Sequence, residues 1–346
     1  MPETPRPRAV RYGFCAVPGK KVPAMQKRTV VLGGSGFIGS HLCLRLLDAG
    51  HEVFCIDLRE AAHSPLLRSV TGHPAFRYVR HNIVHPFSIR CNELYNLASP
   101  VALCYNQALP VEALKVNMLG SINALDTART EHARVVCASS YDVYGQPMRA
   151  SYPQPRNARL HDRICADGKR AAEALHRAYR SEFGVDTRIA RIFNTYGSGA
   201  DLTDQRVVIK MVVAALQNRT IQVTGNGEQL RTFCWVGDIV EGLVRLMQVA
   251  PAEQTRTVDL GSPHEISIRA LAEQIIELTG SRSHIMHPEV RPDDVRRRMP
   301  DLTVARNELD WIPETTLTEG LRRTIGYVEK ALAEKAYAGM TWAEIN

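Results

Sequence analysis

Short runs of apolar, mostly β-branched residues alternate along the chain with stretches whose apolar positions recur every three or four residues. The first pattern predicts strands and the second predicts helices, and their alternation is typical of βαβ units with a parallel sheet. Strands are expected at Thr29–Leu32, Glu52–Asp57, Glu93–Leu97, Arg134–Ser139, Asp186–Ile192 and Thr255–Leu260. Helices are expected at Ile38–Ala49, Val111–Arg129, Gly168–Phe183, Val207–Gln217 and Val236–Val249.

This order of elements predicts an α/β fold, in which a Rossmann-type doubly wound parallel sheet carries a smaller, discontinuous C-terminal lobe. The sheet domain is expected to comprise residues 25–192 and 235–260, and the smaller lobe residues 193–234 and 261–346. Residues 1–24 are rich in proline and basic side chains and lack periodicity, so they are interpreted as a disordered tail.

The composition of the 346 residues, 45% hydrophobic and 23% charged, is typical of a globular protein and includes no apolar run long enough to cross a bilayer. The net charge of +7 is spread along the chain, which argues against nucleic-acid binding. None of the eight cysteines forms a C-x-x-C pair, so we expect reduced thiols in a cytoplasmic protein and no metal site.

A glycine-rich segment joins the first expected strand to the first expected helix. Gly33, Gly36 and Gly39 have the spacing G-x-x-G-x-x-G, and Asp57 ends the next strand. Such glycines let the backbone approach a pyrophosphate at a helix N-terminus, and the acid can accept both ribose hydroxyls. Because Asp57 would repel a 2′-phosphate, NAD is favoured over NADP, although Arg59 keeps NADP open.

Four further motifs accompany the glycine loop, namely Leu97-Ala98-Ser99-Pro100, Gly168-Lys169-Arg170-Ala171-Ala172-Glu173, Ala190-Arg191-Ile192-Phe193-Asn194-Thr195-Tyr196-Gly197 and the segment 225–233. Together they resemble the NAD-dependent epimerase/dehydratase family, the extended short-chain dehydrogenases/reductases, and are most similar to its UDP-glucuronate decarboxylases. The resemblance runs from Arg28 to Ile325. It implies a homodimeric enzyme that binds NAD through the sheet domain and a nucleotide sugar through the smaller lobe.

Residue by residue, the resemblance adds cofactor positions to the glycines and Asp57. These are Phe37, Ile38, Asn82, Leu97, Ser99, Asn117 and Lys169. For the substrate it implies that Asn194 and Arg231 hold the nucleotide diphosphate, with Arg206 and Gln229 nearby, and that Arg298 lies near the sugar carboxylate. Arginine suits these positions because its planar fork pairs with two phosphate oxygens, although a single arginine is more often a solvated surface residue.

The chemistry implied by the resemblance is a redox cycle: NAD⁺ oxidises the sugar at C4, the resulting β-keto acid loses CO₂, and NADH reduces the ketone. The family's base is the tyrosine of Tyr-x-x-x-Lys, assisted by the lysine and by a Ser or Thr hydroxyl. Here Lys169 and Ser140 match the lysine and the hydroxyl, but Cys165 occupies the tyrosine position. A cysteine thiol is too short to reach directly where a phenolic oxygen would lie.

Two neighbours of Ser140 are candidates for the missing base. Tyr141 brings a phenol into the site or packs as a core aromatic, and Asp142 stands where the family has a carboxylate. Cys165 itself acts through a water or merely enlarges the pocket. The sequence therefore leaves open decarboxylation or epimerisation through a 4-ketone, a non-redox lyase or isomerase reaction on the same ligand class, and a catalytically retired paralogue.

Overall fold

The computed structural model describes residues 10–11, 27–100, 109–144, 160–204, 206–251, 256–288 and 299–337. The chain forms two compact units. The first contains residues 1–191 and 243–258, and the second contains residues 192–242 and 259–346. Each unit is described separately below.

Seven strands in the described part of the chain form one sheet, in the order β13-β8-β7-β6-β2-β3-β4. Their bounds are β2 (Arg28–Leu32), β3 (Glu52–Asp57), β4 (Phe76–Arg80), β6 (Glu93–Asn96), β7 (Arg134–Ser140), β8 (Thr187–Ile192) and β13 (Arg256–Leu260). β2 pairs in parallel with β3 and β6, β3 with β4, and β6 with β7. The strand order reverses between β2 and β6, and ligands of such sheets bind beyond the carboxyl ends of the strands at this switch point.

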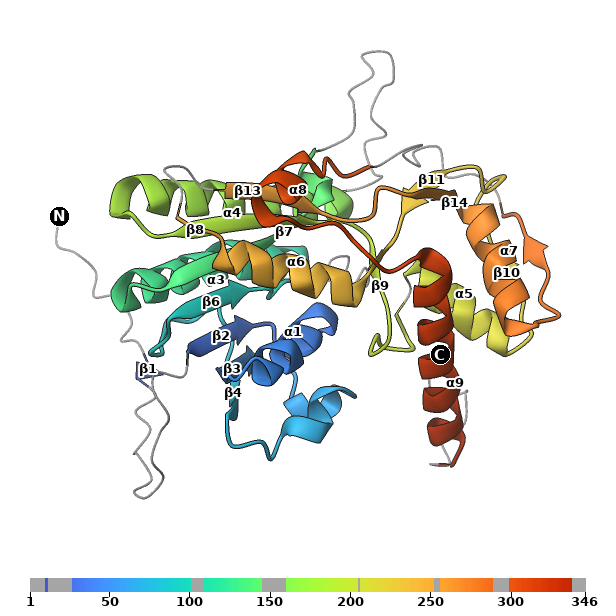
Figure 1. Cartoon of the computed structure of the whole chain (residues 1–346), viewed down its shortest axis with the longest axis horizontal. Coiled ribbons are helices and arrows are strands. Elements are labelled where there is room, and N and C mark those ends of the chain that lie inside the picture. Colours follow the sequence, from blue (N-terminus) through green and yellow to red (C-terminus); the bar gives the residue numbers. More distant parts are fainter. Residues whose placement is uncertain are drawn as a thin grey trace, which may run out of the picture. The chain divides into compact units, whose positions relative to one another are not determined.

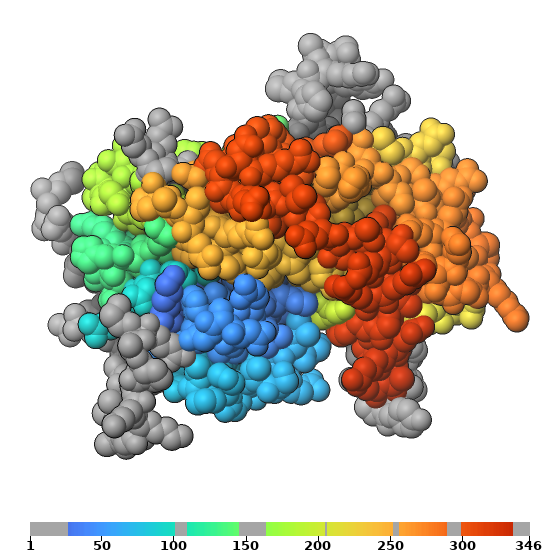
Figure 2. Space-filling view, viewed as in Figure 1, coloured from blue at the N-terminus to red at the C-terminus, as the bar shows by residue number. Residues whose placement is uncertain are grey.

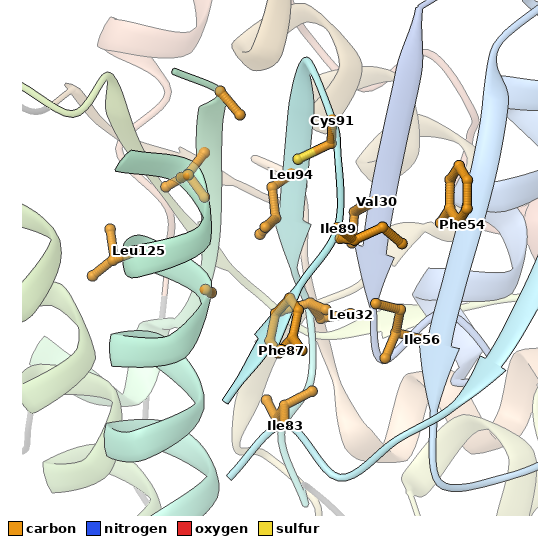
Figure 3. Close-up of a cluster of buried hydrophobic side chains, with 14 of the residues drawn as sticks. Val30, Leu32, Phe54, Ile56, Ile83, Phe87, Ile89, Cys91, Leu94 and Leu125 are labelled. Carbon is orange, nitrogen blue, oxygen red and sulfur yellow. The ribbon is translucent and has the colours of Figure 1, made fainter. Parts of the chain in front are cut away.

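The sheet is buried on the face covered by α3 (Pro110–Glu131). Alternate residues of the central strands, such as Val30 and Leu32 of β2 and Leu94 of β6, pack with Leu125 of α3 (Figure 3). Because successive strand residues point to opposite faces, Val31 faces the other way and is equally buried. Both faces of these strands are therefore apolar, as expected for a parallel sheet covered by helices on each side.

Helix α1 (Phe37–Asp48) follows β2 and contacts both β2 and β3. It buries Gly39, Ser40, Leu42, Cys43 and Leu46. The segment that contains α1, coloured blue, forms part of the molecular surface in Figure 2. α4 (Leu160–Phe183) contacts α3 along its length and also packs against β7. Figure 1 shows α1, α3 and α4 with the strands that they follow.

The second unit is built from short strands and helices. β9 (Thr195–Tyr196) pairs with β12 (Cys234–Trp235), β10 (Ile221–Gln222) with β15 (Ile285–Met286), and β11 (Leu230–Thr232) with β14 (Glu265–Ser267). Helices α5 (Val207–Leu216), α7 (Ile268–Thr279) and α9 (Leu317–Tyr337) contact one another, and α8 (Thr303–Leu309) precedes α9 (Figure 1). The division between the two units falls within α6 (Val236–Gln248).

The expected α/β fold with a doubly wound parallel sheet is confirmed, and most predicted bounds agree within two residues. One predicted bound was wrong, and several elements were not predicted. α4 begins at Leu160 rather than Gly168, β4 was missed as an edge strand, and α7, α8 and α9 were not predicted. β4 buries only Phe76 and Val79, and as the last strand of the sheet it lacks the continuous apolar run of the central strands.

Within residues 1–26 the structure describes only β1 (Val10–Arg11), which pairs with β5 (Phe87–Ser88). The rest of the segment expected to be a disordered tail lies outside the described residues. Among the described residues, no helix has the length and apolar character needed to span a membrane.

Candidate functional site

The glycine loop lies at the switch point of the sheet. Gly33 directly follows β2 with φ of +76°, and a Cβ at this position would lie 2.7 Å from backbone atoms of Ala98, which follows β6. A Cβ at Gly39 would overlap the carbonyl oxygen of Gly33 and lie 2.8 Å from the Cα of Gly34. These glycines are therefore required by close backbone contact, and the loop after β2 touches the chain after β6.

The N-terminus of α1 opens onto this loop. Gly36 is the N-cap and provides no side-chain hydrogen bond, and the first turn, which contains Phe37, Ile38 and Gly39, has no acidic residue. The amide groups of this turn have no carbonyl partner within the helix, and the helix dipole adds positive charge there. This loop and helix start fit a pyrophosphate, because a bound anion can accept from amides that no side chain satisfies.

Asp57 ends β3 beside the glycine loop, and its carboxylate is held by backbone amides. The amide of Ser35 donates to Oδ2 at 3.0 Å, and the amide of Arg59 donates to Oδ1 at 3.0 Å. Burial raises the pKa of Asp57, while these backbone hydrogen bonds act in the opposite direction. The Arg59 guanidinium donates to the His63 carbonyl at 2.9 Å. The Asp57 carboxylate is thus fixed beside the glycine loop, and its role as ribose acceptor stays a prediction.

The remaining cofactor candidates lie along α3 and the loops after β4 and β6. The Ser99 hydroxyl donates to Oδ1 of Asn117 at 3.3 Å, and Asn117 is buried in α3. A Cβ at Gly168 of α4 would lie 3.1 Å from the Asn117 amide, so this glycine permits the close approach of α4 to α3. Leu97 donates its amide to the Leu32 carbonyl. Asn82 accepts from the Val84 amide at 3.2 Å in a tight turn after β4.

Lys169 lies on α4, with its ammonium group buried against β7. Its Nζ donates to the Ala138 carbonyl at 2.7 Å, and only 6% of the residue is exposed. Burial lowers the pKa of Lys169, and the nearby thiols of Cys137 and Cys165 act against this effect. Cys165, one helical turn before Lys169, is half-buried. The expected proximity of this thiol and the lysine is therefore present in the structure.

Ser140 ends β7, and Tyr141 and Asp142 begin the turn η3 (Tyr141–Tyr144) directly after it. The Ser140 hydroxyl donates to Oδ2 of Asp142 at 2.9 Å and accepts from the Asp142 amide at 3.2 Å. Tyr141 is half-buried. The structure therefore brings the candidate hydroxyl and carboxylate into direct contact at the carboxyl end of β7.

A buried carboxylate that the sequence analysis did not single out lies one turn after Lys169. Glu173 is 2% exposed and accepts two hydrogen bonds from Arg191, at 2.9 and 2.8 Å, and one from the Ser139 hydroxyl at 2.7 Å. Despite its burial, hydrogen bonds from Arg191, Ser139 and Arg177 lower the pKa of Glu173 to about 2. Its spacing of four residues from Lys169 on a helix was the available sequence signal.

A thiol and an imidazole are also buried behind Lys169. His176 is fully buried on α4, its Nδ1 lies 2.8 Å from the Ala172 carbonyl, and its Nε2 has no hydrogen-bond partner among the described residues. Burial raises the pKa of Cys137 on β7, but the charges of His176 and Lys169 outweigh it and leave that pKa below its ordinary value. Neither residue was predicted, because a buried cysteine and histidine are usual core residues.

Four of the residues expected to bind the substrate lie in the second unit, namely Asn194, Arg206, Gln229 and Arg231. Nδ2 of Asn194 donates to the Thr232 carbonyl at 3.1 Å, which ties the segment after β8 to β11. The Arg231 guanidinium donates to its neighbour's carbonyl, and Nε2 of Gln229 donates to the Thr224 carbonyl at 3.1 Å. Arg206 forms an ion pair with Asp204, and 55% of its side chain is exposed. Asn194 and Arg231 thus lie near β11, whereas Arg206 precedes α5.

The last predictions from the sequence concern Arg298, the cysteines and metal binding. Arg298 lies outside the described residues, so its placement near a carboxylate stays a prediction. Five of the six described cysteines are buried, namely Cys43, Cys55, Cys91, Cys137 and Cys234, and Cys165 is half-buried. In the described part of the chain, no cluster of three or more His, Cys, Asp or Glu side chains is arranged to hold a metal ion.

The fold and this glycine site define a dinucleotide-binding α/β protein. The sequence matches the GDP-mannose 4,6-dehydratase family over residues 30–324, and the chain belongs to that family. It is 38% identical over 317 residues to UDP-glucuronic acid decarboxylase 1 of Danio rerio, covering 90% of this chain and 75% of the relative. It is also 38% identical over 301 residues to UDP-glucuronic acid decarboxylase 5 of Arabidopsis thaliana, covering 85% of this chain and 87% of the relative.

A solved structure shows a similar arrangement. MoeE5 in complex with UDP-glucuronic acid and NAD has a TM-score of 0.73 and 25% identity, and the match covers 88% of this chain and 99% of that chain. The resemblance inferred from the glycine loop and the four further motifs is confirmed.

Proposed function

We propose that the protein is an NAD-dependent enzyme that modifies a nucleotide sugar of the UDP-glucuronate type, by decarboxylation or epimerisation through a 4-ketone. One observation carries the proposal: the cradle formed by Gly33, the N-terminus of α1 and Asp57 lies at the switch point, in a chain 38% identical to UDP-glucuronic acid decarboxylases. The cradle fits NAD because a Cβ would fill it and no side chain caps it. NAD would supply the acceptor for a hydride from the sugar.

Different groups of the chain are proposed to bind different parts of NAD and to supply charge in the site. The amides at the start of α1 hold the pyrophosphate, and Asp57 accepts from the adenine-side ribose with lone pairs that its backbone amide contacts leave available. Lys169 places a buried positive charge behind the carboxyl end of β7. A positive charge there favours the deprotonated form of an acidic group in the site. Ser99 and Asn117 form the wall contributed by α3.

Asp142 is our preferred proton acceptor, working through Ser140. The Ser140 hydroxyl already donates to Oδ2 of Asp142 at 2.9 Å. When a sugar hydroxyl donates to the Ser140 oxygen, the serine proton can pass to the carboxylate, so the pair removes one proton without a phenol. Tyr141, the next residue, is the alternative base. Cys165 would act only through a bridging water.

In the second unit, Asn194 and Arg231 are proposed to hold the diphosphate of the nucleotide sugar, and Gln229 assists them. The Asn194 side chain donates a hydrogen bond to the Thr232 carbonyl of β11, the strand that contains Arg231. This hydrogen bond keeps the two residues close together. Arg206 is assigned a lesser role, because it is exposed and already paired with Asp204. Arg298 is proposed to contact the carboxylate of the sugar.

Cys165 at the tyrosine position favours a second candidate, a non-redox lyase or isomerase that uses Asp142 on a substrate with an existing carbonyl. A retired paralogue that only binds its ligands is the remaining alternative. To decide among them, the protein is incubated with NAD⁺ and UDP-glucuronate, absorbance of NADH is followed, and products are analysed by mass spectrometry. The proposal expects NADH absorbance or a decarboxylated or epimerised product.

The matched control is Lys169→Met, which should abolish turnover because it removes the buried charge. Binding of both ligands without NADH or product, measured by calorimetry, would support the retired paralogue. Turnover of a keto sugar nucleotide without NADH would support the non-redox candidate.

We further propose a cytoplasmic homodimer. Exposed apolar side chains on α3, namely Val111, Met118 and Leu119, lie on a surface helix and are between 42% and 61% exposed. Apolar side chains gathered on one helix are typical of a subunit contact. Sedimentation analysis should give a dimer in the parent and a monomer in Met118→Glu, and a monomeric parent would refute the proposal. The free cysteines suit a reducing compartment.

A further inference from the structure

The segment 139–144 carries three candidate catalytic residues, and both of its ends contact the same buried ion pair. At the start, the Ser139 hydroxyl donates to Oε1 of Glu173 at 2.7 Å. At the end, the guanidinium carbon of Arg191 lies 4.6 Å from the centre of the Tyr144 ring. Glu173 and Arg191 are joined by two hydrogen bonds, at 2.9 and 2.8 Å. One ion pair therefore contacts both the first and the last residue of the segment.

The geometry of this ion pair makes it a firm attachment. Two hydrogen bonds to one carboxylate fix both the position and the orientation of an arginine fork. Oε2 of Glu173 also accepts from Arg177 at 2.9 Å. Tyr144 is 56% exposed, so solvent reaches much of its ring and burial alone does not hold it. The Arg191 guanidinium over the ring, together with a hydrogen bond between the two side chains, ties Tyr144 to β8.

The same attachment links the segment to the helix that carries Lys169. Glu173 is one helical turn after Lys169 on α4. Arg170, which directly follows Lys169, donates from Nε to the Val143 carbonyl at 2.9 Å. α4 thus contacts the segment at its start through Glu173 and near its end through Arg170. A shift of α4 would move Lys169 and this segment together.

We propose that Glu173 and Arg191 form a positioning clamp that holds Ser140 and Asp142 in register with Lys169. The inference deepens the proposed function and rests on it for the catalytic consequence. The clamp itself does not touch the substrate. It restricts the turn η3, so that the Ser140 hydroxyl keeps its hydrogen bond to Asp142. Loss of the clamp should loosen this turn while leaving the glycine loop intact.

Tyr144→Leu is the primary test, because an exposed position tolerates replacement without unfolding. Hydrogen exchange of peptides covering 139–144 should become about fivefold faster, as expected from the loss of one cation–π contact of ~1 kcal/mol. The turnover number should fall by a similar factor, while NAD affinity and the Michaelis constant stay unchanged. Tyr144→Phe keeps the ring but loses the hydroxyl that bonds to Arg191, so it should speed the exchange less than Tyr144→Leu.

Phe183→Leu is the matched control. The Arg129 guanidinium lies 4.2 Å from the centre of the Phe183 ring, which is 40% exposed and lies at the far end of α4. Its removal deletes a comparable contact and should leave exchange of 139–144 unchanged. Arg191→Lys keeps the charge but not the fork, and should also speed the exchange.

Unchanged exchange in Tyr144→Leu, or equal acceleration in Phe183→Leu, would overturn the clamp. The exchange result does not depend on turnover. Faster exchange in Tyr144→Leu, combined with a parent that never turns over UDP-glucuronate, would therefore support the clamp and refute the proposed function, so the two failures are distinguishable.

Discussion

Replacing Glu173 with glutamine tests the central ion pair through its effect on stability. Glu173→Gln keeps the size and shape of the side chain but removes the charge that faces Arg191. Hydrogen bonds lower the pKa of Glu173 to about 2, below the value near 4.3 of an unfolded glutamate. A depressed carboxyl pKa stabilises the folded state above the unfolded pKa, and this contribution is lost as pH falls toward the folded pKa.

The expected magnitude follows from the two pKa values. A carboxyl group whose pKa falls from about 4.3 to about 2 stabilises the folded state by ~3 kcal/mol at neutral pH. The side chain of Glu173 is only 3% exposed, so solvent screens the interaction little. Glu173→Gln should therefore lose ~3 kcal/mol of unfolding free energy at pH 7. The difference from the parent should shrink as pH falls from about 5 toward about 2.

Urea unfolding followed by circular dichroism, repeated between pH 7 and pH 3, measures this difference. Glu112→Gln is the control, because Glu112 pairs with Lys115 at the surface, with their side chains 40% and 47% exposed. It should change stability by less than about 0.5 kcal/mol at every pH. A destabilisation by Glu173→Gln that is independent of pH, or as small as that of the control, would refute the reasoning.

Four further predictions concern the cofactor and the base. Gly39→Ala should abolish NAD binding in calorimetry, because its Cβ would lie 2.8 Å from a backbone Cα of the loop, whereas Gly72→Ala meets no atom within 4 Å and should bind normally. The parent should bind NAD more tightly than NADP because of Asp57, and the reverse order in calorimetry would contradict this. If the phenol is the base, Tyr141→Phe should abolish turnover and keep substrate binding, while Cys165→Ala is tolerated; the opposite result would indicate that the thiol acts through a water. Cys165→Tyr should gain decarboxylation if the rest of the site is still arranged for it, and continued inactivity would contradict that.

Local patterns along the chain predict much of the fold. Strands and helices of the sheet domain follow from periodicity, because a buried parallel strand must be apolar on both faces and a covering helix must be apolar on one. The glycine spacing and Asp57 predict a dinucleotide site, because both are set by backbone conformation over a short distance. The edge strand β4 was missed because only two of its five residues are buried, so it has no continuous apolar run.

The amino-acid sequence by itself determined which chemical groups are present, including Lys169, Ser140 and Cys165. Only the tertiary structure decided which of them meet. The contact of Glu173 with Arg191 and Ser139 joins α4, β8 and β7, and spacing along the chain does not specify contacts between separate elements. Burial decides the electrostatics in the same way. Hydrogen bonds keep the buried Glu173 carboxylate charged, and two of its donors, Arg191 and Ser139, reach it only when the helix packs on the sheet.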